Sequence, residues 1–369
     1  MTYKAPTRFS KTAIDKAGRY VADMIGEYGV DPDGIDEAID TINSWRESHS
    51  YPLKIIAYTL RKRAHKVDTS ALISQRLKRI PSVIRKLRRN QTHTMRLTSM
   101  NDMGGCRAVV SNMEALNALV DKMTVAGKKN PNRSHELEDW YDYINEPKAD
   151  GYRGIHYIYK YQSKAEPAQQ WNGYRVEMQL RTQLQHAWAT AVETYDVLSK
   201  EHLKFAHNDT HGDPKWKRFF ALAAGAFALR EGTSPIPETP INEMELLDEL
   251  RELCEELSVW RFFGGVSVAV KEMDHWKTKA KHKADQAILV LDSKQWQVSV
   301  DPYTKDEAEM AAAALLEIEK RNDPDILAVL VKVEDLDKLR TAYPNYYADT
   351  EMFTQALTEA TAHDDASED

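Results

Sequence analysis

Apolar and polar positions alternate along the chain with two different periods, and the period changes near residue 71. In the first seventy residues, apolar side chains recur every three or four positions, which predicts helices over residues 36–48 and 51–66. Residues 71–78 can form a strand, and Pro81 favours the start of a helix over residues 81–90. A single helix kinked at Pro81 is the other possibility.

The middle of the chain predicts a sheet whose strands are interspersed with helices. The predicted strands are residues 104–111, 152–162 and 173–180, and the predicted helices are residues 112–124, 182–198 and 216–231. Together they indicate an α+β fold with a mixed β-sheet flanked by helices.

A polar stretch with three prolines, residues 232–243, is the best linker candidate in the chain. Beyond it, the pattern predicts helices over residues 243–257 and 307–321 and strands over residues 261–270, 287–291, 296–300 and 326–333. We therefore predict three parts: residues 1–231, whose N-terminal portion is helical, the linker, and a smaller α+β domain over residues 244–369.

Charge divides the 369-residue chain at the same linker. Residues 1–231 carry 36 Lys and Arg against 27 Asp and Glu, whereas residues 232–369 carry 14 against 30, so the formal charges are +9 and −16. One interpretation of this asymmetry is chance composition of two solvated surfaces. Alternatively, the basic part binds a polyanion, and the acidic part docks on it and opposes that binding.

Cysteine usage and hydropathy exclude other classes of protein. The two cysteines, Cys106 and Cys254, form neither a zinc-type spacing nor a disulfide framework, which predicts a reducing cytoplasm. No run of eighteen apolar residues occurs, and the N-terminal segment lacks the apolar core of a secretion signal. We expect no association with a membrane.

Residues 76–89, RLKRIPSVIRKLRR, place seven cationic side chains in fourteen positions. The chain has no glycine-rich phosphate loop, so side chains must hold any nucleotide. Arg76 and Lys78 point to the same side of the predicted strand, and Ser82 and Lys86 share one face of the helix that follows. This set can bind a nucleotide or can form a solvated basic helix face.

Two acidic residues are candidates for a catalytic site. Asp102 precedes the predicted strand over residues 104–111, and Glu177 lies inside the strand over residues 173–180. If both face one pocket, they can hold Mg²⁺, and one can accept a proton from an attacking hydroxyl. The alternatives are an ordinary turn residue for Asp102 and a solvent-facing strand position for Glu177.

The segment YINEPKADGYRGIHY, residues 143–157, contains a loop shaped by one proline and two glycines. Tyr152 can stack on a base, and Lys148 can meet a phosphate. A tyrosine packed in the core and a hydrogen-bonded His156 are the alternatives.

These motifs, in this order, resemble the synthetase domain of the RelA/SpoT family, the (p)ppGpp synthetases. The resemblance rests on R-x-K-x-x-x-S-x-x-x-K at residues 76–86, D-x-x-x-x-R at 102–107, PKADGYRGIH at 147–156 and VEMQLRTQLQHAW at 176–188, and it covers roughly residues 50–200. It implies an ATP-dependent pyrophosphokinase that transfers pyrophosphate from ATP to a ribose hydroxyl and releases AMP. No HD-type hydrolase signature precedes the domain, so we expect no hydrolysis.

The resemblance implies a donor site for ATP. Arg76 and Arg107 would sandwich the adenine, and Lys78, Ser82 and Lys86 would contact the phosphates. Such chemistry depends mainly on positioning and on neutralisation of charge.

The resemblance also implies a catalytic and acceptor site. Asp102 and Glu177 would ligate Mg²⁺, Glu177 would act as general base, and Tyr152 would stack on the acceptor base. The remaining acceptor-binding residues would be Lys148, His156, Gln179 and Arg181.

The QHAW ending and the extra C-terminal domain resemble the toxic small alarmone synthetases, in particular the fused toxin–antitoxin type called CapRel. This implies transfer of pyrophosphate to the 3′ end of tRNA, with translation blocked, and restraint by the C-terminal domain until a phage capsid protein binds. Tyr343 and Tyr346 would insert between Arg76 and Arg107, or else pack within their own domain. Deletion of residues 232–369 would then give a constitutively toxic protein.

The sequence does not decide the identity of the acceptor. Seven further cations are candidates for contacts with tRNA phosphates: Arg79, Arg85, Arg88, Arg89, Lys128, Lys129 and Arg133. Two alternatives remain, an alarmone synthetase that makes (p)ppGpp or (p)ppApp from free nucleotides, and an inactive RNA-binding or phage-sensing module.

Overall fold

The computed structural model describes residues 6–24, 32–89, 95–129, 135–198, 213–264, 285–292, 297–321, 323, 326–332 and 346–362. Contacts divide the chain into two compact units: unit 1 comprises residues 1–144 and 154–183, and unit 2 comprises residues 145–153 and 184–369. The predicted parts 1–231, 232–243 and 244–369 concern which segment catalyses and which regulates, and that division stays a prediction.

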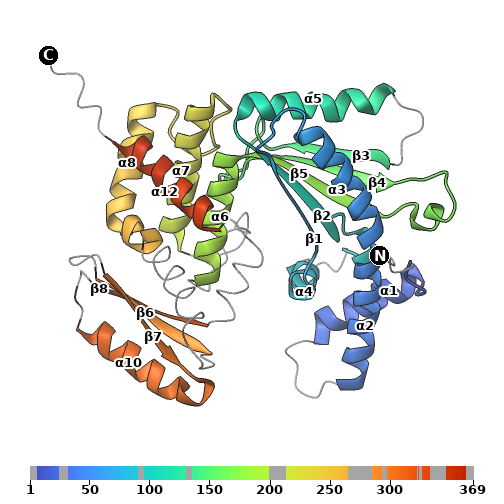
Figure 1. The fold of residues 1–369 in the computed structure, drawn as a ribbon. Helices are drawn as coiled ribbons and strands as arrows, with labels where there is room; N and C mark the ends of the chain where they lie inside the picture. The colour runs from blue at the N-terminus through green and yellow to red at the C-terminus, as the bar shows by residue number, and fades with distance from the viewer. Residues whose placement is uncertain are drawn as a thin grey trace. The chain divides into compact units, whose positions relative to one another are not determined.

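Unit 1 is built on a five-stranded mixed sheet with helices packed on it, which confirms the predicted α+β class (Figure 1). The strand order is β1-β2-β5-β4-β3, and within it only β2 and β5 run parallel. The strands are β1 (Leu72–Leu77), β2 (Gly104–Val110), β3 (His135–Asp142), β4 (Ile155–Tyr161) and β5 (Arg175–Thr182). The helices are α1 (Lys11–Met24), α2 (Pro32–Ser48), α3 (Ser50–Ala64), α4 (Ile80–Arg89) and α5 (Met113–Lys129), with short 3-10 turns at Leu97–Ser99 and Ala168–Trp171.

One face of this sheet is apolar because side chains alternate between the two faces along each strand. Helices α3 and α5 cover that face and share a buried core with β2, β4 and β5. The core includes Leu60, Cys106, Ala108, Leu116, Tyr157, Met178 and Leu180. The opposite face is left to the polar side chains described below.

Helix α4 is a separate helix with Pro81 as its second residue, so the single helix kinked at proline does not form. Val83 and Leu87, four residues apart, are buried in a core with Ile14 of α1 and Ile42 of α2. Since one side of α4 is fixed in this way, its cationic side chains are directed away from that core.

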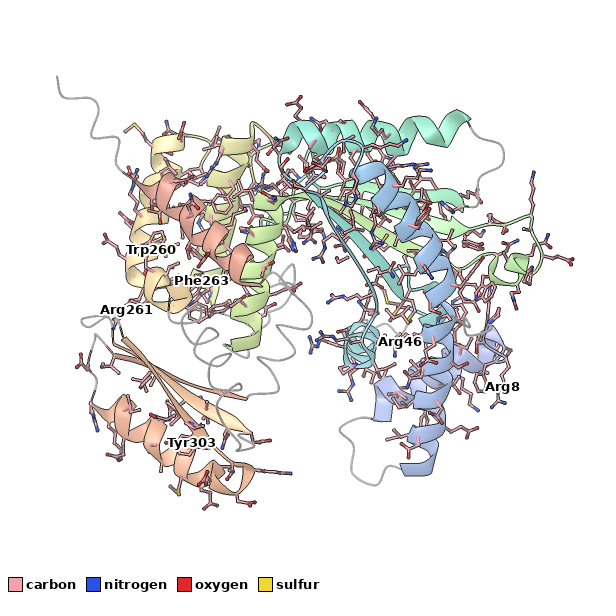
Figure 2. The ribbon with its side chains drawn as sticks, viewed as in Figure 1. Arg8, Arg46, Trp260, Arg261, Phe263 and Tyr303 are labelled. Atoms are coloured by element: carbon pink, nitrogen blue, oxygen red, sulfur yellow. The ribbon has the colours of Figure 1, made fainter. Side chains whose placement is uncertain are left out.

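Unit 2 contains a second large core, formed by α6 (Gln183–Leu198), α7 (Pro214–Glu231), α8 (Glu243–Glu256) and α12 (Tyr346–Thr361) (Figure 1). Helix α7 is apolar on most of its surface, and Phe227 packs against Phe353 of α12 with ring centres 5.7 Å apart. Trp260 and Phe263 lie on the helical turn that follows α8 (Figure 2). Helices from both sides of the predicted linker therefore share one core.

The predicted strand over residues 261–270 is wrong at its start. Residues 261–264 are helical, and residues 265–270 lie outside the described residues. The ring centres of Phe263 and Phe353 are 5.1 Å apart. Tertiary packing of Phe263 therefore overrides the strand propensity of this segment.

Unit 2 also contains an antiparallel three-stranded sheet of order β7-β6-β8, with strands β6 (Gln286–Asp292), β7 (Gln297–Tyr303) and β8 (Ile326–Lys332). A 3-10 turn (Lys305–Glu307) leads into α10 (Ala308–Lys320), which packs against β6 and β8. Among the described helices of both units, none is long and apolar enough to cross a membrane.

We expect the stability of unit 1 to depend on pH through His49. This side chain is 1% exposed, its Nδ1 donates a hydrogen bond of 2.8 Å to the carbonyl of Trp45, and burial lowers its pKa to about 4. Below pH 6.5 the unfolded chain binds a proton that folded His49 excludes, so the free energy of unfolding should fall by roughly 3 kcal/mol by pH 4.

Urea denaturation at several pH values measures this dependence. His49→Gln should flatten it, whereas His65→Gln, at an exposed position of the same segment, should leave it unchanged. An equal slope for His49→Gln and the parent chain would contradict the assignment.

Candidate active site

Paired residues form rows across the polar face of the unit 1 sheet, which we call the site face. Residues that lie opposite each other on neighbouring strands share a face, so the register fixes each row. One row is Arg76, Gly105, Glu177, Ile158 and Asp139, and the next is Ser74, Arg107, Gln179, His156 and Tyr141. The sheet thus brings predicted donor, catalytic and acceptor residues onto one surface.

Asp102 lies between two ammonium groups at the end of this face. Its carboxylate accepts hydrogen bonds from Lys78 (2.6 Å) and from Lys86 (3.0 Å) of α4. Burial alone would raise the pKa of Asp102, but the charges and hydrogen bonds of both lysines hold it below its usual value. Asp102 is therefore ionised at neutral pH, and both predicted phosphate-binding lysines lie at the carboxylate.

Glu177 is the second carboxylate, with 18% of its side chain exposed. Nδ1 of His156 lies 2.9 Å from one carboxylate oxygen, and Nε2 of Gln179 donates to the other at 2.9 Å. Burial and the charge of Asp102 raise the pKa of Glu177, but His156 and Gln179 lower it by more, so the net shift is downward. The network extends to Arg107, whose Nε donates to Oε1 of Gln179 at 3.2 Å.

The two carboxylates lie within electrostatic range of each other, since the charge on Asp102 acts on the pKa of Glu177. Beside Glu177, Gly105 leaves open space on the site face: an added Cβ would meet only the carbonyl oxygen of Glu177 within 4 Å, at 3.9 Å. Among the described residues, no group of three or more His, Cys, Asp or Glu side chains could hold a metal. A cation here would need phosphate or water ligands besides these carboxylates, as is typical of Mg²⁺.

The remaining cations of the basic segment lie around this centre. Arg76 is exposed beside Gly105 in the register, and Arg107 is partly buried in the neighbouring row. Ser82 is partly buried on α4, four residues before Lys86. Of the further cations, Arg79 and Arg85 are exposed, and Arg88 donates to the carbonyl of Ala22 at 2.9 Å.

Residues 145–153 belong to unit 2. Because this segment carries the predicted acceptor-binding residues Lys148 and Tyr152, we call it the acceptor loop. The backbone N–H of Tyr152 donates to Oδ1 of Asp150 at 2.9 Å, and Nζ of Lys148 lies 5.4 Å from the centre of the Tyr152 ring. The Tyr152 ring is partly buried and packs against the core of unit 2. An acidic oxygen at position 150 therefore holds the turn. The packing of Tyr152 is that of the core alternative, and its stacking on a base stays a prediction.

Gly151 fixes the acceptor loop to the helices of unit 2. Its φ is +91°, and an added Cβ would lie 2.7 Å from Ala224 and 2.9 Å from Trp188. Only glycine combines this backbone conformation with such close packing.

Arg153 and Glu231 form a buried ion pair at the end of the same loop. The distance between Nη1 and Oε2 is 2.6 Å, and the side chains are 2% and 8% exposed. Gln185 of α6 donates to the same carboxylate oxygen at 3.1 Å, and Nη1 of Arg153 also contacts the hydroxyl of Thr233 at 3.2 Å. Sequence reasoning missed this pair because its members are 78 residues apart.

Arg181 and Gly154 are further described residues beside Gln179 of the site face. Arg181 is 5% exposed and donates to Oε1 of Gln179 at 3.3 Å. An added Cβ on Gly154 would lie 3.2 Å from Cγ of Arg181, so a larger residue would press on that side chain.

Several predicted residues are only partly covered by the structure. Tyr343 and Arg133 lie outside the described residues, and for Arg89, Lys128, Lys129 and Tyr346 only the helix backbone is described. Their proposed contacts with ATP or RNA stay predictions.

Strand β3 was not predicted, and it adds Tyr141 to the site face. Acidic residues dominate the sequence HELEDWYD, and a bulge between Leu137 and Asp139 interrupts its period of two. The aromatic residues before the predicted loop were the signal that could have revealed the strand.

Comparisons with known proteins agree with the sequence resemblance over the sheet. The model described as a region found in RelA / SpoT proteins matches residues 75–200. No curated protein sequence matches the chain.

Several solved structures are similar to part of the chain. Small alarmone synthetase 1 from Bacillus subtilis, bound to its product pppGpp, is 22% identical, with 49% of this chain and 88% of that chain covered and a TM-score of 0.38. Small alarmone synthetase 2 from the same organism is 18% identical, with 51% of this chain and 92% of that chain covered and a TM-score of 0.39. A GTP pyrophosphokinase family protein from Streptococcus pneumoniae is 21% identical, with 55% of this chain and 90% of that chain covered and a TM-score of 0.36.

We expect Glu231→Ala to destabilise unit 2 by about 3–5 kcal/mol, because it leaves the buried guanidinium of Arg153 without its carboxylate. The matched control is Glu359→Ala on α12, which removes the partner of Arg230, the neighbour of Glu231 on α7, in a solvent-exposed pair. Urea denaturation followed by tryptophan fluorescence compares the two. Equal stabilities for both variants would contradict a structural role for the buried pair.

Proposed function

We propose that the chain is an ATP-dependent pyrophosphokinase that modifies the 3′ end of tRNA and thereby blocks translation. The observation that carries the proposal is the pair of ionised carboxylates, Glu177 on the site face and Asp102 at its end, where Lys78 and Lys86 bind Asp102. Arg76 and Arg107 lie in the rows of the same face. The match to a region found in RelA / SpoT proteins supports pyrophosphate transfer as the reaction.

In this proposal Glu177 acts as the general base. The acceptor hydroxyl attacks the β-phosphorus of ATP, the bond from this phosphorus to the bridging oxygen of the α-phosphate breaks, and AMP leaves. The proton of the hydroxyl passes to Glu177. Its lowered pKa leaves it deprotonated at neutral pH, and hydrogen bonds with His156 and Gln179 hold its two oxygens in place.

Lys78 and Lys86 supply positive charge to the phosphates that move. Both now bind Asp102, and ATP phosphates would compete for them, which would release the carboxylate for a cation. Mg²⁺, when bound by Asp102 and Glu177, would neutralise charge on the transferred group. Arg76 and Arg107 are the candidates for stacking on adenine, and Ser82 is the candidate for a further phosphate contact.

Transfer to tRNA is supported by the excess of cations in residues 1–231 and by the exposed Arg79, which precedes α4, and Arg85, which lies within it. The acceptor end of tRNA is single-stranded, and proteins hold such ends by stacking and by cationic surfaces. Tyr152 is the candidate for the stacking ring at the acceptor nucleotide, with Lys148 beside it.

We further propose that the C-terminal part restrains the enzyme and that a phage protein, such as a capsid protein, releases it in anti-phage defence. The charge of −16 on residues 232–369 supports an interaction with the basic part of the chain. A partner shifts such an equilibrium only if it binds the released state more tightly.

An acceptor assay with ATP labelled in the β- or γ-phosphate tests the reaction. We expect label in tRNA, and we expect Glu177→Gln to reduce transfer by about 10²–10⁴-fold because the proton acceptor is lost. The control is Glu114→Gln, at an exposed position of α5, which covers the opposite face of the sheet.

If label appears only in small nucleotides, the acceptor is a free nucleotide and not tRNA. Label in neither, together with an unchanged effect of Glu177→Gln on translation, would favour an RNA-binding or phage-sensing module without catalysis.

Restraint is better tested by point substitution than by truncation. Deletion of residues 232–369 would also remove Phe353 and Leu357 from the core around Phe227, and so would expose apolar α7. We expect the Tyr343→Ala, Tyr346→Ala double variant to transfer pyrophosphate faster than the parent in the labelled-ATP assay. Tyr347→Ala is the matched control, and equal rates for all three chains would contradict a blocking role for the two tyrosines.

A further inference from the structure

Tyr141 and Tyr143 form a stacked pair at the edge of the site face. Their ring centres are 5.9 Å apart with an angle of 4° between the planes, and 40% of Tyr141 is exposed. Tyr143 meets His156 edge to face, with ring centres 5.2 Å apart. A chain of rings therefore leads from the exposed edge of the sheet to Glu177, the partner of His156.

The orientation of this pair is fixed by contacts within unit 1. Tyr141 lies opposite His156 in the strand register, and the backbone N–H of Tyr143 donates to the carbonyl of Gly154 at 3.0 Å. The hydroxyl of Tyr141 donates to Oδ2 of Asp139 at 2.6 Å. An exposed ring that is held at its hydroxyl and at its backbone keeps one plane, so little conformational entropy is lost when a flat ligand stacks on it.

The electrostatic surroundings favour an uncharged ring beside the catalytic centre. The hydrogen bond to Asp139 is the main reason that the pKa of Tyr141 is raised, and the charge of Glu177 contributes. The hydroxyl therefore stays protonated at neutral pH, and Tyr141 lies within electrostatic range of Glu177.

We propose that Tyr141 and Tyr143 form a stacking platform for a nucleobase of a single-stranded RNA acceptor, next to the nucleotide that receives pyrophosphate. The proposal rests on the proposed function, in which Tyr152 takes the base of the reacting nucleotide. A second base is expected only for a polynucleotide acceptor, so the platform would distinguish tRNA from a free nucleotide. Stacking on an aromatic ring tolerates any base, whereas Arg107 in the same row of the site face would supply charge for phosphates.

Binding measured without ATP tests the platform apart from catalysis. The probe is a 5′-fluorescein-labelled single-stranded RNA hexamer that ends in CCA, titrated with the full chain and followed by fluorescence anisotropy. Tyr141→Ala should raise the Kd about tenfold, and Tyr141→Phe, which keeps the ring, should stay within about twofold of the parent. Tyr58→Ala, a 64% exposed tyrosine on α3, is the matched control and should bind as the parent does.

Thermal unfolding of each variant shows whether a change in Kd arises from a loss of structure. An unchanged Kd for Tyr141→Ala, an equal loss for Tyr141→Phe, or no binding by the parent would each overturn the platform. If the Kd depends on Tyr141 but no label reaches tRNA from ATP, the platform stands and the proposed function fails. If label reaches tRNA while the Kd is independent of Tyr141, the function stands and the platform fails.

Discussion

The ionised carboxylate of Glu177 on a mostly buried sheet face is the feature on which the candidate site depends. A carboxylate with 18% of its side chain exposed would be costly without partners, and His156 and Gln179 of the next row, on β4 and β5, supply them. The partners reach it because the register places β4 directly beside β5. Arg107 extends this network through Gln179, and Asp102, bound to Lys78 and Lys86, acts on Glu177 through its charge.

The fold separates this polar network from a dry core by strand alternation alone. Cys106 and Met178 point into the core under α3 and α5, whereas their neighbours Arg107 and Glu177 point to the other face. Helix α4 is divided in the same way: Val83 and Leu87 pack in the core on one side, and Lys86 binds Asp102. Binding groups thus sit on elements that are fixed by apolar contacts on their other side.

Period and motif were enough to predict the elements that carry strong alternation. The strands with Arg107 and Glu177 were predicted from their apolar positions, and the helix start at Pro81 was predicted from the preference of proline for the first helical turn. Strand β3 was missed because a bulge and acidic residues hide its period, and the helix at Phe263 was missed because its conformation depends on packing against Phe353. Pairings between distant residues, such as Arg153 with Glu231, leave no local signal, so spacing cannot reveal them.

The acceptor loop has a consequence for the order in which a new chain acquires its parts. Gly151 packs on Ala224 and Trp188, and Arg153 binds Glu231, so the loop is translated well before the helices that hold it. The core of those helices is complete only with Phe353 and Leu357, near the end of the chain. A ribosome that is still making this protein therefore carries a sheet without a supported acceptor loop. The nascent polypeptide cannot assemble that support until almost all of residues 232–369 have also been synthesised.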